Sequence, residues 1–320
     1  MWKRLTICVG ALIALVILVI LFIDKEGYDK PVLLPRASYP AAPPGQSRDT
    51  LKQPVSTGLA HIFIVLEENE SASSIINNSQ APYINKLAEE YSYAANYSAV
   101  SHPSLPNYLA LTSGSTDGVT SDCNPPAAGC ELSVNNLADE IEKSGRTWKE
   151  YAEGMPSSCY AANSGEYATK HNPFVYYSDI INNSSRCNSH VVPFAQLTND
   201  LQSLATTPDF AFITPNLCDD MHDCSIATGD SWLSTNAQII LQSKAFTTQN
   251  SLLVVVWDEG SSTDNNVAAI LAGSAVKDGY QSQATYSHYS LLHTIESKWS
   301  LPTMTSNDVR APIMNEFFKN

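Results

Sequence analysis

The feature that most constrains the fold of this chain is a series of short apolar runs of strand length. Segments with helical spacing separate these runs. Four runs have the length of a strand: 61–66, 210–214, 251–257 and 266–272. Runs of about 4–8 apolar residues are typical of strands buried on both faces of a sheet. Apolar residues recur at helical spacing in four other segments: 82–91, 133–145, 230–244 and 288–299. Strands that alternate with helices predict a three-layer α/β fold, in which a mainly parallel sheet has helices on both faces.

An uncharged apolar run precedes these patterns. It extends from Leu5 to Ile23, which is just long enough to cross a bilayer, and Lys3 and Arg4 come before it. By the positive-inside rule the short N-terminus stays in the cytoplasm and the rest of the chain lies outside. We therefore expect an N-terminal transmembrane anchor or signal segment at 1–23. A cleaved signal peptide is the alternative, and the length of the run favours the anchor.

Polar residues and prolines follow the apolar run. This composition predicts an extended linker at 24–58 that joins the anchor to one folded domain at 59–320. The expected location is extracytoplasmic, with the chain held at the membrane by a single N-terminal helix, or secreted if that helix is removed. We expect the protein to be a monomer.

The charge of the chain excludes one class of partner. The formal net charge is −14, only 16% of the residues are charged, and no basic run occurs beyond the first four residues. Proteins that bind nucleic acid need a basic footprint. We therefore expect no nucleic-acid partner.

Six of the seven cysteines lie in the part of the chain that we expect outside the cytoplasm, where an oxidising environment favours pairing. They are Cys123, Cys130, Cys159, Cys187, Cys218 and Cys224. The short gaps suggest the pairs Cys123–Cys130 and Cys218–Cys224, which leaves Cys159–Cys187. A zinc site is the alternative, but the sequence contains no CxxC pair.

Carboxylates follow three of the predicted strands. Glu67-Glu68-Asn69 ends the first strand, 215–223 follows the second with three aspartates and a histidine, and Asp258-Glu259 ends the third. Ligands of open α/β sheets bind at the carboxyl ends of the strands. Like charges that meet there repel unless a cation lies among them. Oxygen ligands with one or two imidazoles suit a divalent cation, so we expect one at this edge.

Ser104 lies between two prolines at the start of a helical segment, SHPSLPNYLALTSG at 101–114. The free N–H groups and the dipole of a helix N-terminus favour anions. A hydroxyl at that place, next to a cation, can lose its proton and attack phosphorus. Asn107 lies three residues further on and could donate a hydrogen bond to a phosphoryl oxygen.

Eight motifs in order resemble the phosphoesterase family of acid phosphatases and C-type phospholipases, within the alkaline phosphatase superfamily. They are EEN, HPSLPNYLALTSG, YAEGMP, KHNPFVYY, TPNLCDDMHDC, GDSWL, VVWDEG and SHYSLLHTIE. The resemblance covers about residues 60–301 and is strongest to the small secreted acid phosphatase branch, which is known for phosphatidylinositol 3-phosphate phosphatase activity. It implies an alkaline-phosphatase-like fold and a phosphate monoester substrate, with a phosphoinositide or a nucleotide as candidates.

The resemblance also implies roles for individual residues. Catalytic roles fall to Ser104 as nucleophile, Asn107, His171 and His288. Binding of one or two divalent metal ions falls to Glu68, Asn69, Asp258, Glu259, Asp220 and His222. Substrate binding falls to Asn216 and Lys170.

The chain departs from the family pattern in three places. ENESAS at 68–73 lacks the Phe and Asp of the larger members, Asn216 and Asp220 stand where two-metal members have Asp and His, and Asp258-Glu259 replaces an Asp-His pair. These departures favour one hard cation, or a weak second site, over two zinc ions. Sulfatases share the superfamily fold, but their motif has Arg where this chain has Tyr108.

The sequence leaves three functions in competition. The leading one is a metal-dependent extracytoplasmic phosphomonoesterase that acts through a phosphoserine. A phosphodiesterase of the phospholipase C type is the first alternative, although the chain lacks the long C-terminal extensions of many such relatives. The lesser alternative is a non-catalytic binding protein tethered at the surface. The presence of Ser104, Asp258 and His222 together argues against it.

Overall fold

The computed structural model describes residues 58–319 except 125, 127–129 and 262–263. The predicted anchor at 1–23 and nearly all of the predicted linker at 24–58 lie outside the described residues. In the part of the chain that the structure describes, no helix has both the length and the hydrophobicity to cross a membrane.

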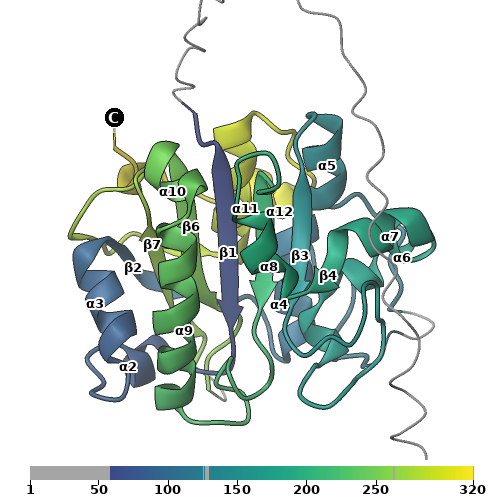
Figure 1. The fold of residues 1–320 in the computed structure, drawn as a ribbon. Helices are drawn as coiled ribbons and strands as arrows, with labels where there is room; N and C mark the ends of the chain where they lie inside the picture. Colours follow the sequence, from purple (N-terminus) through teal and green to yellow (C-terminus); the bar gives the residue numbers. More distant parts are fainter. Residues whose placement is uncertain (1–57, 125, 127–129, 262–263, 320) are drawn as a thin grey trace, which may run out of the picture. The chain divides into compact units, whose positions relative to one another are not determined.

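Nine strands form one sheet within the described residues. Along the sheet their order is β4-β3-β5-β1-β6-β7-β2-β8, and β9 pairs with β2 (Figure 1). Their bounds are β1 His61–Glu67, β2 Ser92–Ser98, β3 Trp148–Ala152, β4 Val191–Pro193, β5 Phe210–Thr214, β6 Ser251–Trp257, β7 Asn266–Ala272, β8 Tyr280–Ser282 and β9 Tyr286–Ser287. Strands β4, β3, β5, β1 and β6 are parallel neighbours, whereas β7 runs antiparallel to both β6 and β2. The predicted mainly parallel α/β sheet is confirmed.

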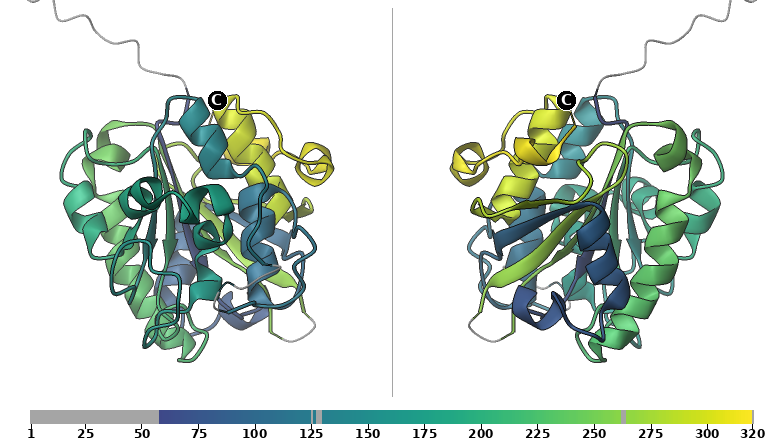
Figure 2. Two further views of the ribbon diagram at one scale, coloured as in Figure 1. Left: turned by 90° about the vertical axis from the view of Figure 1, so that its right-hand side faces the viewer. Right: turned by 90° about the vertical axis from the view of Figure 1, so that its left-hand side faces the viewer.

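Helices cover both faces of this sheet, as the two side views show (Figure 2). On one face, Phe63 of β1 packs edge-to-face against Phe246 of α10 (Lys244–Thr248), and α9 (Ile226–Leu241) lies beside α10. On the other face, Phe212 of β5 contacts Tyr108 of α4 (Ser104–Ser113). Helix α11 (His288–Trp299) packs against α4 on that second face.

The remaining helices are short. They are α2 Ala72–Ile75, α3 Pro82–Glu90, α5 Leu137–Lys143, α6 Ser178–Ile181, α7 Ser184–His190, α8 Gln196–Asp200 and α12 Ser306–Arg310, with the 3₁₀ turns η1 Thr169–His171, η2 Pro173–Tyr176 and η3 Asn315–Phe317. Helix α5 begins later than the predicted 133, because Asn136 caps it in a capping box with Asp139. Helix α9 begins earlier than the predicted 230, at the N-cap Ser225, whose hydroxyl accepts from the Thr228 N–H.

The order of the strands decides where the polar residues meet. Strand β1 lies between β5 and β6, and all seven of its residues are buried. Because β5, β1 and β6 are parallel, their carboxyl ends lie at one edge of the sheet, the lower edge in Figure 1. The segments after these strands carry the carboxylates that the sequence placed there.

Candidate active site

Ser104 is the first residue of α4. Pro103 is the N-cap in extended conformation, and Gly114 ends the helix with a φ of 77°. The Ser104 side chain is 1% exposed, and its hydroxyl donates to Glu68 Oε2 at 3.0 Å. Lys170 Nζ lies 3.5 Å from the same Oγ. A serine oxygen is thus held between a carboxylate and an ammonium group.

Glu68 lies at the centre of the site, one residue past the end of β1. Its Oε1 accepts a hydrogen bond from the Tyr108 hydroxyl and lies 3.1 Å from His171 Nε2. Tyr108 lies one helical turn after Ser104, so both reach Glu68 from the same side of α4. Burial, followed by the charges of Asp258 and Asp220, raises the pKa of Glu68 well above its ordinary value. Three groups, the hydroxyls of Ser104 and Tyr108 and the imidazole of His171, therefore converge on the Glu68 carboxylate.

His171 stands between two carboxylates. Its Nε2 faces Glu68, and its Nδ1 lies 3.2 Å from Asp220 Oδ2. Burial and the positive charge of Lys170 lower the pKa of His171 well below its ordinary value, so the ring is neutral. A neutral imidazole has a single N–H, and therefore one of its two nitrogens turns a lone pair toward a carboxylate. A cation between them removes this repulsion.

Lys170 connects the nucleophile to the loop that carries His222. Besides Ser104, its ammonium group lies 3.2 Å from Asp122 Oδ2 and 3.1 Å from His222 Nε2. Because an ammonium group only donates, the Nε2 of His222 accepts and its Nδ1–H donates to Asp223 at 2.7 Å. Burial lowers the pKa of Lys170, but the charges of Glu68 and Asp122 outweigh it, and the net shift is upward. Lys170 therefore stays charged.

Asp258 and Glu259 follow β6 on the side of the site opposite Asp220. Burial raises the pKa of Asp258 to about 7, although hydrogen bonds from the backbone N–H groups of Asn69 and Glu259 and the charge of Lys170 lower it. The backbone N–H of Asn69, which has a φ of 56°, donates to Asp258 Oδ1 at 3.3 Å. Glu259 Oε2 lies 2.9 Å from His102 Nδ1. Burial and the charge of Asp258 raise the pKa of Glu259 to about 8.

These residues fit a divalent cation. The side chains of Glu68, His171 and His222 bring one ligand atom each to within 4.8 Å of one another. In the part of the chain that the structure describes, the buried oxygens Asp220 Oδ2 and Asp258 Oδ2 have no hydrogen-bond partner. Buried polar atoms are seldom left unpaired, and a hard cation takes carboxylate oxygens and imidazole nitrogens.

The sequence predicted that Asn107, His288 and Asn216 take part in the reaction. In the structure, the polar atoms of these side chains bind other parts of the protein. Asn107 braces the loop before Ser104: its Oδ1 accepts from the N–H groups of residues 100 and 101, and its Nδ2 donates to the Ser101 carbonyl. His288 is fully buried, and its Nε2 lies 2.6 Å from the Asp258 carbonyl while its Nδ1 lies 3.1 Å from the Tyr97 hydroxyl. Burial lowers the pKa of His288 to about 4. These two side chains position the segments that carry Ser104 and Asp258.

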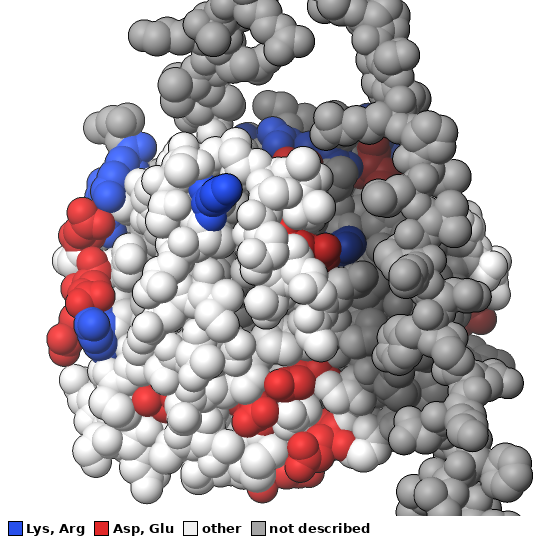
Figure 3. All heavy atoms as spheres, viewed as in Figure 1, with Lys and Arg blue, Asp and Glu red and all other residues white. Residues whose placement is uncertain are grey.

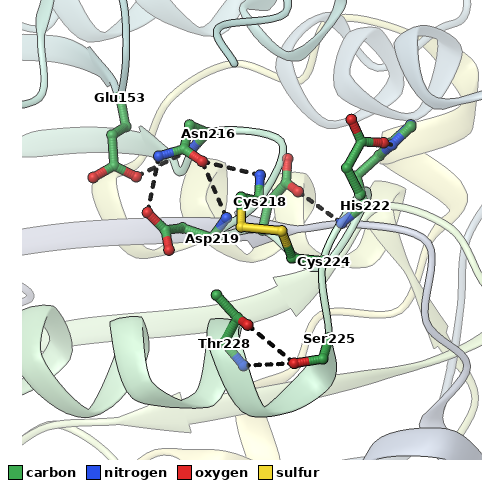
Figure 4. The surroundings of a disulfide bond; sticks show 10 residues. Glu153, Asn216, Cys218, Asp219, His222, Cys224, Ser225 and Thr228 are labelled. Carbon is green, nitrogen blue, oxygen red and sulfur yellow. Dashed lines mark hydrogen bonds and ion pairs between the residues drawn. A yellow bond between two sulfur atoms is a disulfide. The ribbon is translucent and has the colours of Figure 1, made fainter. Parts of the chain in front are cut away.

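Asn216 folds the loop after β5. Its Oδ1 accepts from the N–H groups of Cys218 and Asp219, and its Nδ2 donates to Asp219 Oδ2 at 2.8 Å (Figure 4). Its direct partners are thus in its own loop and at Glu153, whose Oε2 accepts the Asn216 N–H. The Asp220 N–H in turn donates to the Asn216 carbonyl, which holds Asp220 at the site.

Two site residues were missed by the sequence analysis. Asp122 reaches Lys170 from the loop before the Cys123–Cys130 disulfide, and its Oδ1 accepts from the Leu105 N–H at the start of α4. No local pattern marks it, because it lies 18 residues after Ser104 in an irregular segment. The helical spacing of Tyr108 and Ser104 could have identified Tyr108.

All three predicted disulfides are present. They join Cys123 to Cys130, Cys159 to Cys187, and Cys218 to Cys224. The third closes the loop that holds Asp219, Asp220 and His222 (Figure 4).

Comparison with known proteins agrees with this geometry. The model of the Phosphoesterase family matches residues 44–302. The chain is 39% identical over 245 residues to a phosphatidylinositol-3-phosphatase of Mycobacterium tuberculosis, and the match covers 76% of this chain and 78% of that protein. It is 29% identical to a probable acid phosphatase of Kluyveromyces lactis, with 79% of this chain and 61% of the yeast protein covered.

A solved structure shows the same fold. A Vibrio parahaemolyticus protein in the alkaline phosphatase superfamily superimposes with a TM-score of 0.57 at 12% identity, over 80% of this chain and 71% of the other. The family model and the relatives named as phosphatases indicate a hydrolase of phosphoric esters, a phosphatase. The chain belongs to the Phosphoesterase family.

Proposed function

We propose that this phosphatase is an extracytoplasmic phosphomonoesterase that needs a divalent cation and acts through a phosphoserine at Ser104. The observation that carries the proposal is the buried hydroxyl of Ser104 between Glu68 Oε2 and Lys170 Nζ. The location outside the cytoplasm is supported by the three disulfides, which persist in oxidising surroundings.

The side chains divide the reaction between them. The Ser104 Oγ attacks phosphorus in line, its proton passes to Glu68 Oε2, and the bond from phosphorus to the ester oxygen breaks, so that this oxygen leaves and takes a proton from the solvent. The ammonium group of Lys170 stabilises the negative charge that develops beside Oγ. Water then attacks phosphorus on the side opposite Oγ and gives a proton to the solvent, the P–Oγ bond breaks, and Glu68 returns its proton to Oγ.

Glu68, His171 and His222, together with Asp220 and Asp258, are the residues that would hold the cation. When bound, such an ion polarises a phosphoryl oxygen and lowers the pKa of a hydroxyl beside it. We expect activity to disappear after exhaustive chelation and to return when a divalent cation is added back. Full activity in protein shown by elemental analysis to contain no metal would contradict this part of the proposal.

Replacement of the nucleophile tests the mechanism. Ser104→Ala removes the attacking atom, and the expected loss is several powers of ten in rate, on the order of 4–8 kcal/mol of barrier. Ser101→Ala is the matched control, because its hydroxyl donates only to the neighbouring His102 carbonyl. A Ser104→Ala enzyme within about tenfold of the wild type would refute the phosphoserine.

The stereochemistry at phosphorus separates the two ways in which water can act. Two in-line displacements through a phosphoserine retain the configuration of a chirally labelled ester, whereas direct attack by water inverts it. We expect retention, and inversion would rule out Ser104 as nucleophile even if its replacement is inactivating.

The monoester preference has its own test. The mycobacterial relative is named for a phosphoinositide monoester, which supports the same class of substrate here. We expect release from a chromogenic phosphate monoester to exceed release from the corresponding bis-ester. The opposite preference would favour a phosphodiesterase of the phospholipase C type.

A further inference from the structure

A second group of carboxylates lies on the other face of the sheet, and the reaction described above does not use it. Its members are Glu67, Glu153 and Asp219, which come from the ends of β1 and β3 and from the loop after β5. Residues 67 and 68 are consecutive, and so are 219 and 220. In each pair the second residue belongs to the active site and the first lies in this second group.

The strand registers place Glu67 and Glu153 on one face. Val65 pairs with Ile213 across β1 and β5, and Tyr151 pairs with Ile213 across β3 and β5. Continued by two residues, both registers bring Glu67 and Glu153 level with Pro215. Residues at one level of neighbouring parallel strands point to the same face. Glu67 also shares the face of Phe63, which packs against α10, so both glutamates point toward the layer of α9 and α10.

The loop after β5 adds Asp219 to this group. Asp219 Oδ2 accepts from Asn216 Nδ2, and Glu153 Oε2 accepts from the Asn216 N–H (Figure 4). Burial raises the pKa of Glu153, hydrogen bonds from Asn216 and Trp232 oppose that shift, and the nearby Asp219 carboxylate adds to it. The Cys218–Cys224 disulfide fixes the loop, and the absence of a side chain at Gly229 lets α9 approach it closely.

Glu67 is the observation that points to a ligand. Its side chain is 0% exposed, and neither carboxylate oxygen has a hydrogen-bond partner among the described residues. Among the described residues, no ion pair joins Glu67, Glu153 or Asp219 to a lysine, arginine or histidine. A buried, unpaired carboxylate is costly, and the charges of Asp220, Asp219 and Glu153 lie around this one.

The neighbouring strand offers Glu67 little compensation. Trp257 is opposite Glu67 in the β1–β6 register, and its buried indole N–H also lacks a partner. A hydrogen bond from this neutral indole N–H would satisfy one oxygen of Glu67, but it would not balance the negative charge of the carboxylate. The view onto this side shows acidic side chains along the lower edge and no lysine or arginine among them (Figure 3).

We propose that Glu67, Glu153 and Asp219 form a second cation site, on the face of the sheet opposite Ser104, which takes a hard divalent ion such as Ca²⁺. The site has only oxygen ligands, which is the chemistry Ca²⁺ prefers, whereas the active site adds imidazole nitrogens. Glu153 and Asp219 are partly exposed, so the ion enters from the solvent edge. Its role is structural: it holds the ends of β1 and β3 and the loop of Asp219 and Asp220 together.

Terbium luminescence tests the site in the full-length protein. Tb³⁺ replaces Ca²⁺ at oxygen sites, and the indole of Trp232, which donates to Glu153 Oε1 at 3.1 Å, can transfer excitation energy to it. Every variant carries Asp258→Asn as well, which weakens binding at the active site equally in all of them. We expect tryptophan-sensitised luminescence that is lost in Glu67→Gln and Glu153→Gln. Glu166→Gln, the same charge change at an exposed residue, keeps it.

Thermal unfolding separates a metal ligand from a merely structural glutamate. Without metal, Glu67→Gln is expected to be at least as stable as the parent, because it removes one of several repelling carboxylates. Added Ca²⁺ raises the melting temperature of the parent and leaves that of Glu67→Gln unchanged. A variant equally destabilised with and without Ca²⁺ would overturn the proposal, and so would absence of luminescence or its equal loss in Glu166→Gln.

Elemental analysis needs no change at the active site. Wild-type protein equilibrated with Ca²⁺ should hold one more ion per chain than Glu67→Gln. An equal ion content would also overturn the second site. Phosphatase activity that survives in Glu67→Gln leaves the proposed function standing whatever the ion content proves to be.

Discussion

Asp122 occupies a place in the active site that suits a phosphoryl group. Its carboxylate accepts from the Leu105 N–H at 3.3 Å, and it lies 3.2 Å from Lys170 Nζ. A helix N-terminus and an ammonium group are also the donors that an incoming phosphate needs. The Asp122 carboxylate, which is partly exposed, therefore competes with phosphate for the same two groups.

Asp122→Asn should bind phosphate more tightly. The amide keeps the shape of the side chain and removes a negative charge that repels the ligand. We expect inorganic phosphate to inhibit the variant at several-fold lower concentration than the wild type, measured as a competitive inhibition constant. Asp117→Asn in the same connecting segment is the control, since Asp117 accepts from Ser113 and not from Lys170. Weaker phosphate inhibition of Asp122→Asn would show that Asp122 instead helps to orient Lys170.

Single residues also show where sequence patterns stop being informative. Asn107 could be placed near the nucleophile from its spacing, but its amide braces the 100–103 loop. The sequence cannot show whether a polar side chain turns toward a ligand or toward its own backbone, because both satisfy its hydrogen bonds.

At the scale of elements, helices α11 and α12 are joined by two carboxyl groups. Glu296 of α11 is buried beside Asp308 of α12, which caps its own helix by accepting from the Thr305 N–H. Burial, then the charge of Asp308, raises the pKa of Glu296 to about 9. The Met304 N–H opposes this shift, and Glu140 of α5 adds to it.

This pair predicts a loss of stability in alkaline solution. The folded-state pKa of Glu296 lies above its unfolded value of about 4.3, so the folded chain holds the extra proton. The resulting stabilisation is complete below about pH 4 and is lost as the pH rises through about 9. Glu296→Gln keeps the shape of the side chain and never ionises. We expect its melting temperature to fall less between pH 6 and pH 10 than that of the wild type.

Exposed glutamates should not share this behaviour. Glu89→Gln changes an exposed glutamate of α3 and is the control. If Glu296→Gln and the wild type lose the same number of degrees over this pH range, Glu296 does not hold an extra proton in the folded chain.

At the scale of the whole molecule, the core strands were the most predictable part. Strands β1, β5, β6 and β7 are apolar runs because both of their faces are covered, and these runs stand out in the sequence. Strand β2, SYAANYS, was not predicted, because it lies toward the β8 end of the sheet and carries polar residues. The antiparallel direction of β7 could not be predicted from its residues either. The direction of a strand depends on the connections before and after it, not on its own apolar residues.

The sequence could predict those members of the candidate site that follow the ends of strands. Glu68, Asp220, Asp258 and Ser104 were expected at one edge, and the parallel order β5-β1-β6 brings them together. The split between Glu67 and Glu68 was not foreseen, because the side chains of consecutive strand-end residues point to opposite faces. The two faces of the sheet become different only when α4 packs on one of them and α9 on the other.

The last prediction concerns the disulfides, which act on the molecule in two different ways. Loop-closure entropy assigns about 2.5 kcal/mol to a loop as short as that of Cys218–Cys224 and about 3.5 kcal/mol to one as long as that of Cys159–Cys187. The longer loop therefore contributes more to the free energy of unfolding. The shorter one holds Asp219, Asp220 and His222, so its main effect should be on cation binding.

Two double variants separate these effects. Cys159→Ser with Cys187→Ser should lower the melting temperature more while leaving the metal affinity near that of the wild type. Cys218→Ser with Cys224→Ser should lower the melting temperature less and weaken metal binding, measured by titration calorimetry at a temperature where both variants are folded. Equal metal affinities in the two variants would mean that the strand ends alone, without the covalent loop, hold Asp220 and His222 in place.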